Sequence, residues 1–217
     1  MYFKYIYSLS LLIVFIILFP NNLQLKRMRV LIFPQENYIV IDSELTLDQA
    51  LLDLQIPENI KSTLAIINID YYGFDSLTHR GQLVISDKLK TEVIEIFDSL
   101  KKIKYPIEKI IPIVNYSWSD SLSMADNNTS CFNYRNIKGY QLLSDHAYGK
   151  AIDINPIQNP FISYKTRVSQ PFQAEYDTAI QGTILKNSIV VNLFKEKGWK
   201  WGGDWKYSKD YQHFYKK

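Results

Sequence analysis

Residues 144–156 read SDHAYGKAIDINP and hold a histidine, a glycine and two acidic side chains within thirteen positions. The chain has three histidines, and His146 stands seven residues before Asp153. Gly149 permits a turn, and the alternating residues 150–156 that follow are typical of a strand. The stretch therefore predicts a turn and a strand that bring His146 and Asp153 to one point, either as a polar hairpin or as part of a metal site.

A second pairing of an acid with a histidine lies near the C-terminus, where Asp210 and His213 stand at D-x-x-H spacing before Phe214. We expect Asp210 in a turn and His213 on a closing strand, residues 211–215. A catalytic zinc ion takes three protein ligands and keeps one open position, and a carboxylate that is not a ligand can act as the base. The two pairs supply these groups, but their spacing alone leaves plain polar turns as the alternative.

The composition is that of a globular protein, and it limits the chemistry. The chain has 217 residues, of which 47% are hydrophobic and 22% charged, and this suits a single folded domain. The formal charge is +3 without a long run of Lys or Arg, so we expect no nucleic-acid partner. Cys131 is the only cysteine, which excludes an intrachain disulfide and CxxC zinc sites. A metal must then be held by His, Asp or Glu.

Strands and helices are mixed without a βαβ rhythm, which predicts an α+β fold. The clearest helix is residues 86–103, where apolar residues recur at helical spacing and Ser86 or Asp87 could cap the first turn. Further strands are expected at residues 28–34, 37–42, 62–74 and 106–116, helices at 46–55 and 184–198, and a long loop at 118–135.

The N-terminal segment contains an uncharged apolar run, residues 5–19. It is shorter than the roughly 20 residues of a membrane span and fits the core of a signal peptide, although no cleavage site of small residues follows it. The basic residues at 26–29 lie on the wrong side for a simple anchor with a cytoplasmic N-terminus. We expect export to the periplasm or cell envelope, with residues 1–20 as a signal peptide or membrane anchor.

Three motifs in this order resemble the M15 metallopeptidases, a D-alanyl-D-alanine carboxypeptidase-like group that acts on bacterial cell-wall peptides. The family pattern is S-x-H-x-x-G-x-A-x-D, then W-G-G-D/N-W, then D/E-x-x-H-F. Residues 144–153, 201–205 and 210–214 fill its three parts. The segments HRGQLVIS, residues 79–86, and SMADNNTSCFNYR, residues 123–135, look like the same branch, so the resemblance covers about residues 60–217.

The resemblance implies a small α+β domain with a central antiparallel sheet and flanking helices, hedgehog/D-Ala-D-Ala-peptidase-like. It assigns His146, Asp153 and His213 to one Zn²⁺ and Asp210 to the general base. The implied reaction is attack of water on a peptide carbonyl that zinc polarises, after which Asp210 passes the proton to the leaving amine. Relatives often use an arginine upstream of the first histidine to steady the carbonyl oxygen or a substrate carboxylate, and Arg135 is the candidate here.

Several other residues have two interpretations each. Ser144 could contact substrate or bond the backbone at the turn, and Trp201 could line the cleft or pack around the glycine pair. Asp204 could orient a ligand histidine or cap a turn. Arg80 could bind a substrate carboxylate or remain solvated, and His79 is expected on the surface or in a loop.

The sequence thus predicts zinc-dependent hydrolysis of a peptide bond in peptidoglycan stem peptides, of D,D-carboxypeptidase or L,D-endopeptidase type. The alternative is a non-catalytic domain that binds cell-wall peptides and keeps the M15 fold. Residues 21–59 are expected to form a linker and N-terminal strands, and residues 60–217 the peptidase domain. We expect a monomer whose partner is the stem peptide, with membrane contact only through the N-terminal segment.

Overall fold

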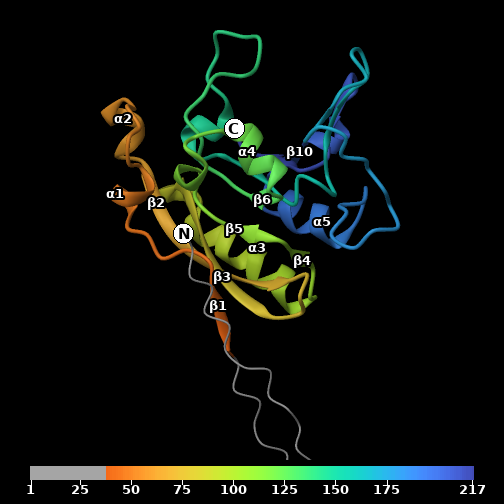
Figure 1. Cartoon of the computed structure of the whole chain (residues 1–217), viewed down its shortest axis with the longest axis horizontal. Coiled ribbons are helices and arrows are strands. Elements are labelled where there is room, and N and C mark those ends of the chain that lie inside the picture. Colours follow the sequence, from red (N-terminus) through yellow and green to blue (C-terminus); the bar gives the residue numbers. More distant parts are fainter. Residues whose placement is uncertain (1–37) are drawn as a thin grey trace, which may run out of the picture. The chain divides into compact units, whose positions relative to one another are not determined.

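A computed structural model describes residues 38–217, and its elements are shown in Figure 1. The helices of this part are α1 (Leu47–Ala50), α2 (Glu58–Lys61), α3 (Lys90–Lys102), α4 (Asp120–Ala125) and α5 (Ile189–Glu196). Short 3-10 helices lie at Asp87–Leu89, Ile113–Tyr116, Asp145–Tyr148 and Gly202–Asp204. The strands are β1 (Ile39–Ile41), β2 (Leu64–Gly73), β3 (Thr78–Ser86), β4 (Pro106–Ile107), β5 (Lys109–Ile110), β6 (Asn128–Thr129), β7 (Ala151–Asp153), β8 (Phe161–Ser163), β9 (Ser169–Gln170), β10 (Lys200–Trp201), β11 (Ser208–Asp210) and β12 (His213–Tyr215).

The largest sheet has four strands in the order β1-β3-β2-β4. β2 and β3 pair antiparallel over their whole length, while β1 and β4 add as short parallel edge strands. The expected strands at 37–42 and 62–74 are confirmed as β1 and β2. β3 was not expected, because its last six residues are all buried and so show no alternation of apolar and polar residues.

Helix α3 packs against β2 and joins the sheet to α5 (Figure 1). The helical spacing seen in the sequence buries Val93, Ile96, Phe97 and Leu100, so this prediction is confirmed. The expected cap at Ser86 or Asp87 is wrong. The 3-10 turn Asp87–Leu89 precedes the helix, and no side chain caps its first turn.

The apolar core consists of two clusters. In the larger one Phe194 of α5 stacks on Phe214 of β12 with ring centroids 4.0 Å apart, and Trp199 meets Phe194 edge-on. The smaller one lies under α1 and α2 and contains Ala50, Leu51, Ile60, Leu64, Val84 and Phe132. The C-terminal strands are thus anchored on α5 and α3, which makes them a firm base for the side chains on their edges.

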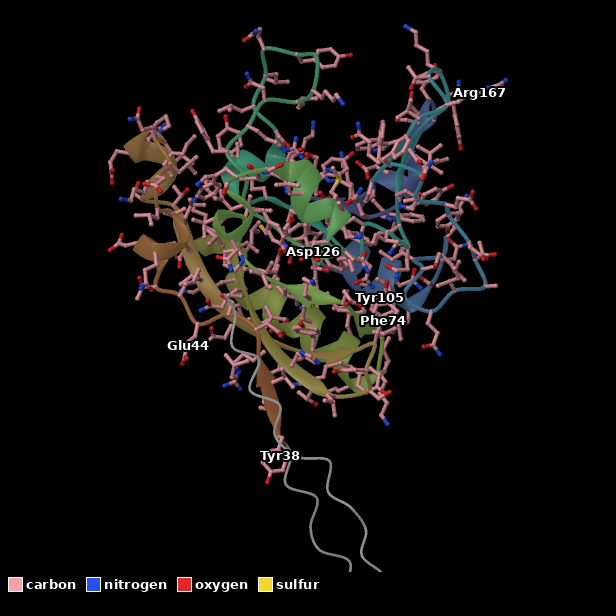
Figure 2. The ribbon with its side chains drawn as sticks, in the orientation of Figure 1. Tyr38, Glu44, Phe74, Tyr105, Asp126 and Arg167 are labelled. Carbon is pink, nitrogen blue, oxygen red and sulfur yellow. The ribbon has the colours of Figure 1, made fainter. Side chains whose placement is uncertain are left out.

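The expected α+β class is confirmed, and the strands of the described part divide among several small sheets. Two are three-stranded and antiparallel, β10-β12-β7 and β11-β8-β9, and β5-β6 is a parallel pair. The β8–β9 hairpin extends away from the rest of the structure, with Arg167 near its tip (Figure 2). The sheet β10-β12-β7 carries the acid and histidine groups singled out by the sequence.

The segment 118–135, expected to be a loop, instead contains α4 and β6. Ser119 caps α4 by accepting a hydrogen bond from Leu122 N, and Asn128 is fully buried. The Asn128 side chain donates to Ile111 O and accepts from Ile111 N. The segment reads as a polar loop because its buried polar side chains serve as hydrogen-bonding partners for neighbouring backbone.

The expected strand at 106–116 is only partly confirmed, since it holds β4, β5 and a 3-10 turn. The helix expected at 184–198 is α5, which begins after the Ser188 cap, while Gly198 follows it with a positive φ of 82°. No helix within residues 38–217 is long and apolar enough to cross a membrane. The signal peptide or anchor at 1–20 and the strand at 28–34 lie outside the described residues, and the domain limits at 20 and 59 stay predictions.

Candidate metal centre

His146 is positioned by the turn that the sequence indicated. It lies in the 3-10 helix Asp145–Tyr148, where the Ser144 hydroxyl accepts a hydrogen bond from His146 N. Gly149 ends this helix with φ of 61° and its carbonyl accepts from Ser86 N at the end of β3. A Cβ on Gly149 would lie 2.5 Å from Ser86 N. Only glycine therefore lets the turn pack this closely against β3.

Asp153 and His213 are brought together by strand pairing. β7 and β12 are antiparallel neighbours, and their register places Asp153 directly opposite His213. Asp153 also pairs through its backbone with Ser130. Opposed residues on adjacent strands have side chains on the same face of the sheet. Asp153 and His213 are sixty residues apart in the sequence and are neighbours in the folded structure.

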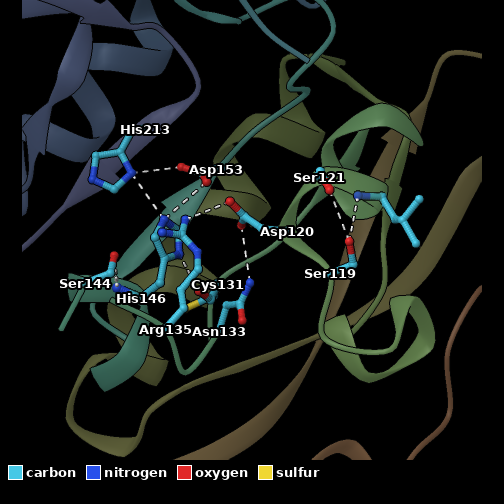
Figure 3. Close-up of polar contacts among 11 residues, drawn as sticks. Ser119, Asp120, Ser121, Cys131, Asn133, Arg135, Ser144, His146, Asp153 and His213 are labelled. Atoms are coloured by element: carbon cyan, nitrogen blue, oxygen red, sulfur yellow. Dashed lines mark hydrogen bonds and ion pairs between the residues drawn. The ribbon is translucent and has the colours of Figure 1, made fainter. Parts of the chain in front are cut away.

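The side chains of His146, Asp153 and His213 converge on one point (Figure 3). His146 Nε2 lies 3.3 Å from His213 Nδ1, and the two nitrogens lie 3.2 and 2.9 Å from Asp153 Oδ2 and Oδ1 respectively. Donor atoms around a tetrahedral ion with bonds of about 2.0–2.2 Å stand about 3.3–3.6 Å apart. The nitrogen–nitrogen distance matches this spacing and the two nitrogen–oxygen distances are shorter, so the donor atoms lie close to the arrangement of ligands around one metal ion.

The first histidine also has its tautomer set by the backbone. His146 Nδ1 lies 2.5 Å from the carbonyl oxygen of Cys131, a contact in which the ring nitrogen donates. In the neutral ring the lone pair then lies on Nε2, which faces Asp153 and His213, whereas in the protonated ring Nε2 donates to Asp153. A ligand histidine normally donates its other N–H in this way, so the chemistry of the donor set fits a metal.

The electrostatics favour a negative carboxylate in this group. Burial opposes ionisation of Asp153, but the neighbouring His146 and the hydrogen bonds from both histidines outweigh it and lower the pKa of Asp153. Burial also opposes charge on His213, yet its hydrogen bond to Asp153 leaves the pKa of His213 raised. A cation between the imidazoles would meet an ionised carboxylate.

Asp210 is the last residue of β11, not a turn residue, and it stands beside this group without belonging to it. Its Oδ1 oxygen is buried and has no hydrogen-bond partner within residues 38–217. Burial raises the pKa of Asp210 to about 7. The WGGDW motif packs directly on this residue, because a Cβ on Gly202 would lie 2.6 Å from the Asp210 carbonyl oxygen. A carboxyl with a free buried oxygen is equipped to take up a proton.

Of the two candidate arginines, the structure places Arg135 at this site. The Arg135 carbonyl accepts from Ser144 N, and its Nη2 forms an ion pair with Asp120 Oδ2 at 3.1 Å (Figure 3). Arg80 instead makes two hydrogen bonds to Asp70, at 2.6 and 3.1 Å, within the large sheet. The guanidinium of Arg80 is therefore engaged with a carboxylate outside the metal centre.

Two further residues of the motifs, Trp201 and Asp204, make contacts with protein groups other than the candidate ligands. Trp201 is 2% exposed and its indole nitrogen donates to Tyr211 O at 2.8 Å, so the ring leaves almost no surface for a substrate, in line with the packing interpretation. Asp204 forms an ion pair with Lys195 at 2.7 Å and is not among the hydrogen-bonding partners of the ligand histidines.

The expectation that His79 lies on the surface or in a loop is wrong. It belongs to β3, and its side chain is 12% exposed between two carboxylates. Its Nδ1 lies 3.1 Å from Asp42 Oδ2 and its Nε2 lies 3.1 Å from Asp75. The hydrogen bond to Asp42, followed by that to Asp75, raises the pKa of His79 despite its partial burial.

Two contributors to the site were not found in the sequence. They are the backbone carbonyl of Cys131, which orients His146, and the carboxylate of Asp120, which pairs with Arg135. A backbone carbonyl has no sequence signal of its own. Asp120 stands fifteen residues before Arg135 in a stretch that read as a loop, and no spacing rule links the two.

Comparison with known proteins agrees with the geometry. Residues 138–216, which contain all three converging side chains and Asp210, match the M15 peptidase family model described as D-alanyl-D-alanine carboxypeptidase. No solved structure matches the chain. The matched region spans the turn, both site strands and the glycine pair, so residues 138–216 of this chain are similar to the M15 peptidase family.

Proposed function

We propose that this chain is a zinc-dependent peptidase that hydrolyses a peptide bond in peptidoglycan stem peptides, as a D,D-carboxypeptidase or an L,D-endopeptidase. One observation carries the proposal. Three donor atoms converge from His146, Asp153 and His213, and beside them Asp210 keeps a buried oxygen without a partner among the described residues. The family match over the same residues supports peptide hydrolysis and a substrate related to D-alanyl-D-alanine.

Two imidazoles and one carboxylate form a donor set that suits zinc, with a fourth position left for water or substrate. Bound zinc would polarise the scissile carbonyl and make a water molecule more acidic. Asp210 accepts the proton of the attacking water at Oδ1 and then delivers it to the leaving amine nitrogen. Arg135 donates hydrogen bonds to the carbonyl oxygen or to a substrate carboxylate.

The cell-wall substrate goes together with a location outside the cytoplasm. We therefore include in the proposal export to the periplasm or cell envelope through residues 1–20, and a monomer that meets a membrane only through that segment. The hedgehog/D-Ala-D-Ala-peptidase-like arrangement around one central sheet is likewise part of the proposal. The stem-peptide partner rests on the family resemblance, and the monomer is an expectation of the same proposal.

The test combines metal analysis with product analysis. The full chain is stripped with a chelator, reloaded with zinc, and incubated with purified peptidoglycan whose soluble products are identified by mass spectrometry. Release of D-alanine alone indicates a carboxypeptidase, and stem fragments cut between two internal residues indicate an endopeptidase. His213→Ala serves as the inactive control. Zinc binding without any cleavage by the wild type would contradict the proposal and favour the non-catalytic peptide-binding domain.

A further inference from the structure

The backbone of Arg135 pairs with the segment that carries His146. Asn133 N donates to His146 O at 3.2 Å, and Ser144 N donates to Arg135 O at 3.0 Å. Segments 133–135 and 144–146 therefore run side by side, which places the Arg135 side chain next to that of His146 (Figure 3). This backbone pairing fixes the position of the Arg135 backbone, but the direction of its long side chain depends on other contacts.

The guanidinium of Arg135 is held at one edge, and the side chain as a whole is 31% exposed. Nη2 pairs with Asp120 Oδ2 at 3.1 Å, whereas Nε is buried and has no hydrogen-bond partner in residues 38–217. A guanidinium carries five N–H donors in one plane. A buried donor without a partner costs free energy unless something binds to it. Because Nε is enclosed by the protein, a ligand can meet only the exposed remainder of the side chain, while Asp120 fixes the plane of the group.

Asp120 is itself held in place. Its Oδ1 accepts from Asn133 Nδ2 at 3.3 Å, while Oδ2 pairs with Arg135, so each oxygen has its own partner. It lies in the first turn of α4, which Ser119 caps. Within the segment from Ser119 to Arg135, Asn133 thus hydrogen-bonds to Asp120, and Asp120 forms the ion pair with Arg135.

We propose that Asp120 is the positioning residue of Arg135, and that it fixes the guanidinium in the plane in which its remaining N–H groups meet the substrate oxygen. Its negative charge also offsets that of Arg135, which would otherwise stand unpaired beside a site that binds a cation. This inference rests on the proposed function, because it gives Arg135 a substrate to meet. Arg135 touches the substrate, and Asp120 acts only through Arg135.

The test is a double-mutant cycle in the zinc-loaded full chain, with a synthetic stem pentapeptide as substrate. Asp120→Asn is expected to lower kcat/KM by about 10- to 100-fold, with zinc affinity unchanged. In the Arg135→Ala background the same substitution should change kcat/KM by less than about twofold, because its only route of action has been removed. Asp120→Glu, which keeps the charge, should recover part of the lost rate.

The matched control is Asp126→Asn at the other end of α4. Asp126 also makes an ion pair, with Lys109 Nζ at 2.8 Å, and accepts from the Tyr116 hydroxyl at 2.7 Å, but it does not contact Arg135. Loss of this carboxylate should leave kcat/KM unchanged. An equal effect of Asp120→Asn in the presence and absence of Arg135 would overturn the inference.

A measurement without turnover separates this inference from the proposed function. In nitrogen-15 spectra of the zinc-loaded chain, the Nε–H signal of Arg135, assigned with Arg135→Lys, should exchange faster with water in Asp120→Asn than in Asp126→Asn. If the wild type cleaves no stem peptide, the proposed function fails, and this signal still decides the positioning role. An Nε–H exchange rate that is equal in both variants would refute that role.

Discussion

Asp210→Asn is the substitution that most directly tests the proton transfer proposed for this site. Asparagine has nearly the same volume as aspartate and can occupy the same place beside Gly202, but it cannot take up a proton. Asp210 does not belong to the converging group His146, Asp153 and His213. We therefore expect the variant to keep its zinc and to lose its rate.

The magnitude follows from the surroundings of the carboxylate. General acid–base catalysis contributes about 10²- to 10⁴-fold to a rate, which corresponds to about 3–5 kcal/mol of activation free energy. Asp210 Oδ1 is buried and unpartnered in the described part of the chain, so no neighbouring hydrogen bond would have to break before it accepts a proton. We expect kcat to fall by about 10³-fold and zinc affinity to change by less than about tenfold.

The assay measures cleavage of the stem pentapeptide at saturating zinc, and zinc affinity is measured by competition with a chromogenic chelator. Asp204→Asn is the matched control, because Asp204 lies in the neighbouring WGGDW motif but pairs with Lys195 on the surface. It should leave both the rate and the zinc affinity unchanged. Release of zinc by Asp210→Asn would make Asp210 a ligand, and a wild-type rate in this variant would exclude it as the base.

Three other outcomes follow from the described contacts. His213→Ala should weaken zinc binding by at least about 100-fold in the same competition assay, because it removes one of three donors; an unchanged affinity would place the metal elsewhere. Gly149→Ala should cost about 2–4 kcal/mol of unfolding free energy in urea, because its Cβ would lie 2.5 Å from Ser86 N. Gly139→Ala, at φ of 83° but with nothing within 4 Å, should cost less, and equal losses would refute the steric explanation. The two carboxylates around His79 raise its pKa above 6.5, so its stabilising contribution is complete below pH 6.5 and is lost as the pH rises through the raised value. The difference in urea midpoint between the zinc-loaded wild type and His79→Gln should therefore shrink from pH 5.5 to pH 8.5, and a constant difference would contradict this assignment.

Local patterns predicted the elements whose periodicity is visible in a short window. Helix α3 and strands β1, β2, β7 and β12 appear where the spacing of apolar residues indicated them. β3 and α4 did not, for opposite reasons. β3 is buried on both faces and shows no alternation, and α4 lies in a stretch whose polar side chains are satisfied by distant backbone.

The spacing of the candidate ligands left plain polar turns as an alternative, and it was the order of the family motifs that singled out these residues and linked the two ends. Arg135 was also found, through the resemblance. Its partner Asp120 and the Cys131 carbonyl were not found, since a hydrogen bond between remote segments produces no recognisable spacing in the sequence. For the same reason the sequence left the roles of Trp201 and Arg80 undecided. The structure shows that Trp201 is buried and that Arg80 is paired with Asp70.

By itself, the sequence determined which reactive groups this chain carries, because side-chain type is local: two imidazoles, two carboxylates and a turn-forming Gly149 in a motif order that residues 138–216 share with the M15 family. The tertiary structure alone decided which groups meet. The register of β7 against β12 sets Asp153 opposite His213. Gly202 packs against Asp210 of β11, whose buried Oδ1 has no hydrogen-bond partner among the described residues. Distances across sixty residues depend on strand pairing and core packing, and these are properties of the whole fold rather than of any single segment.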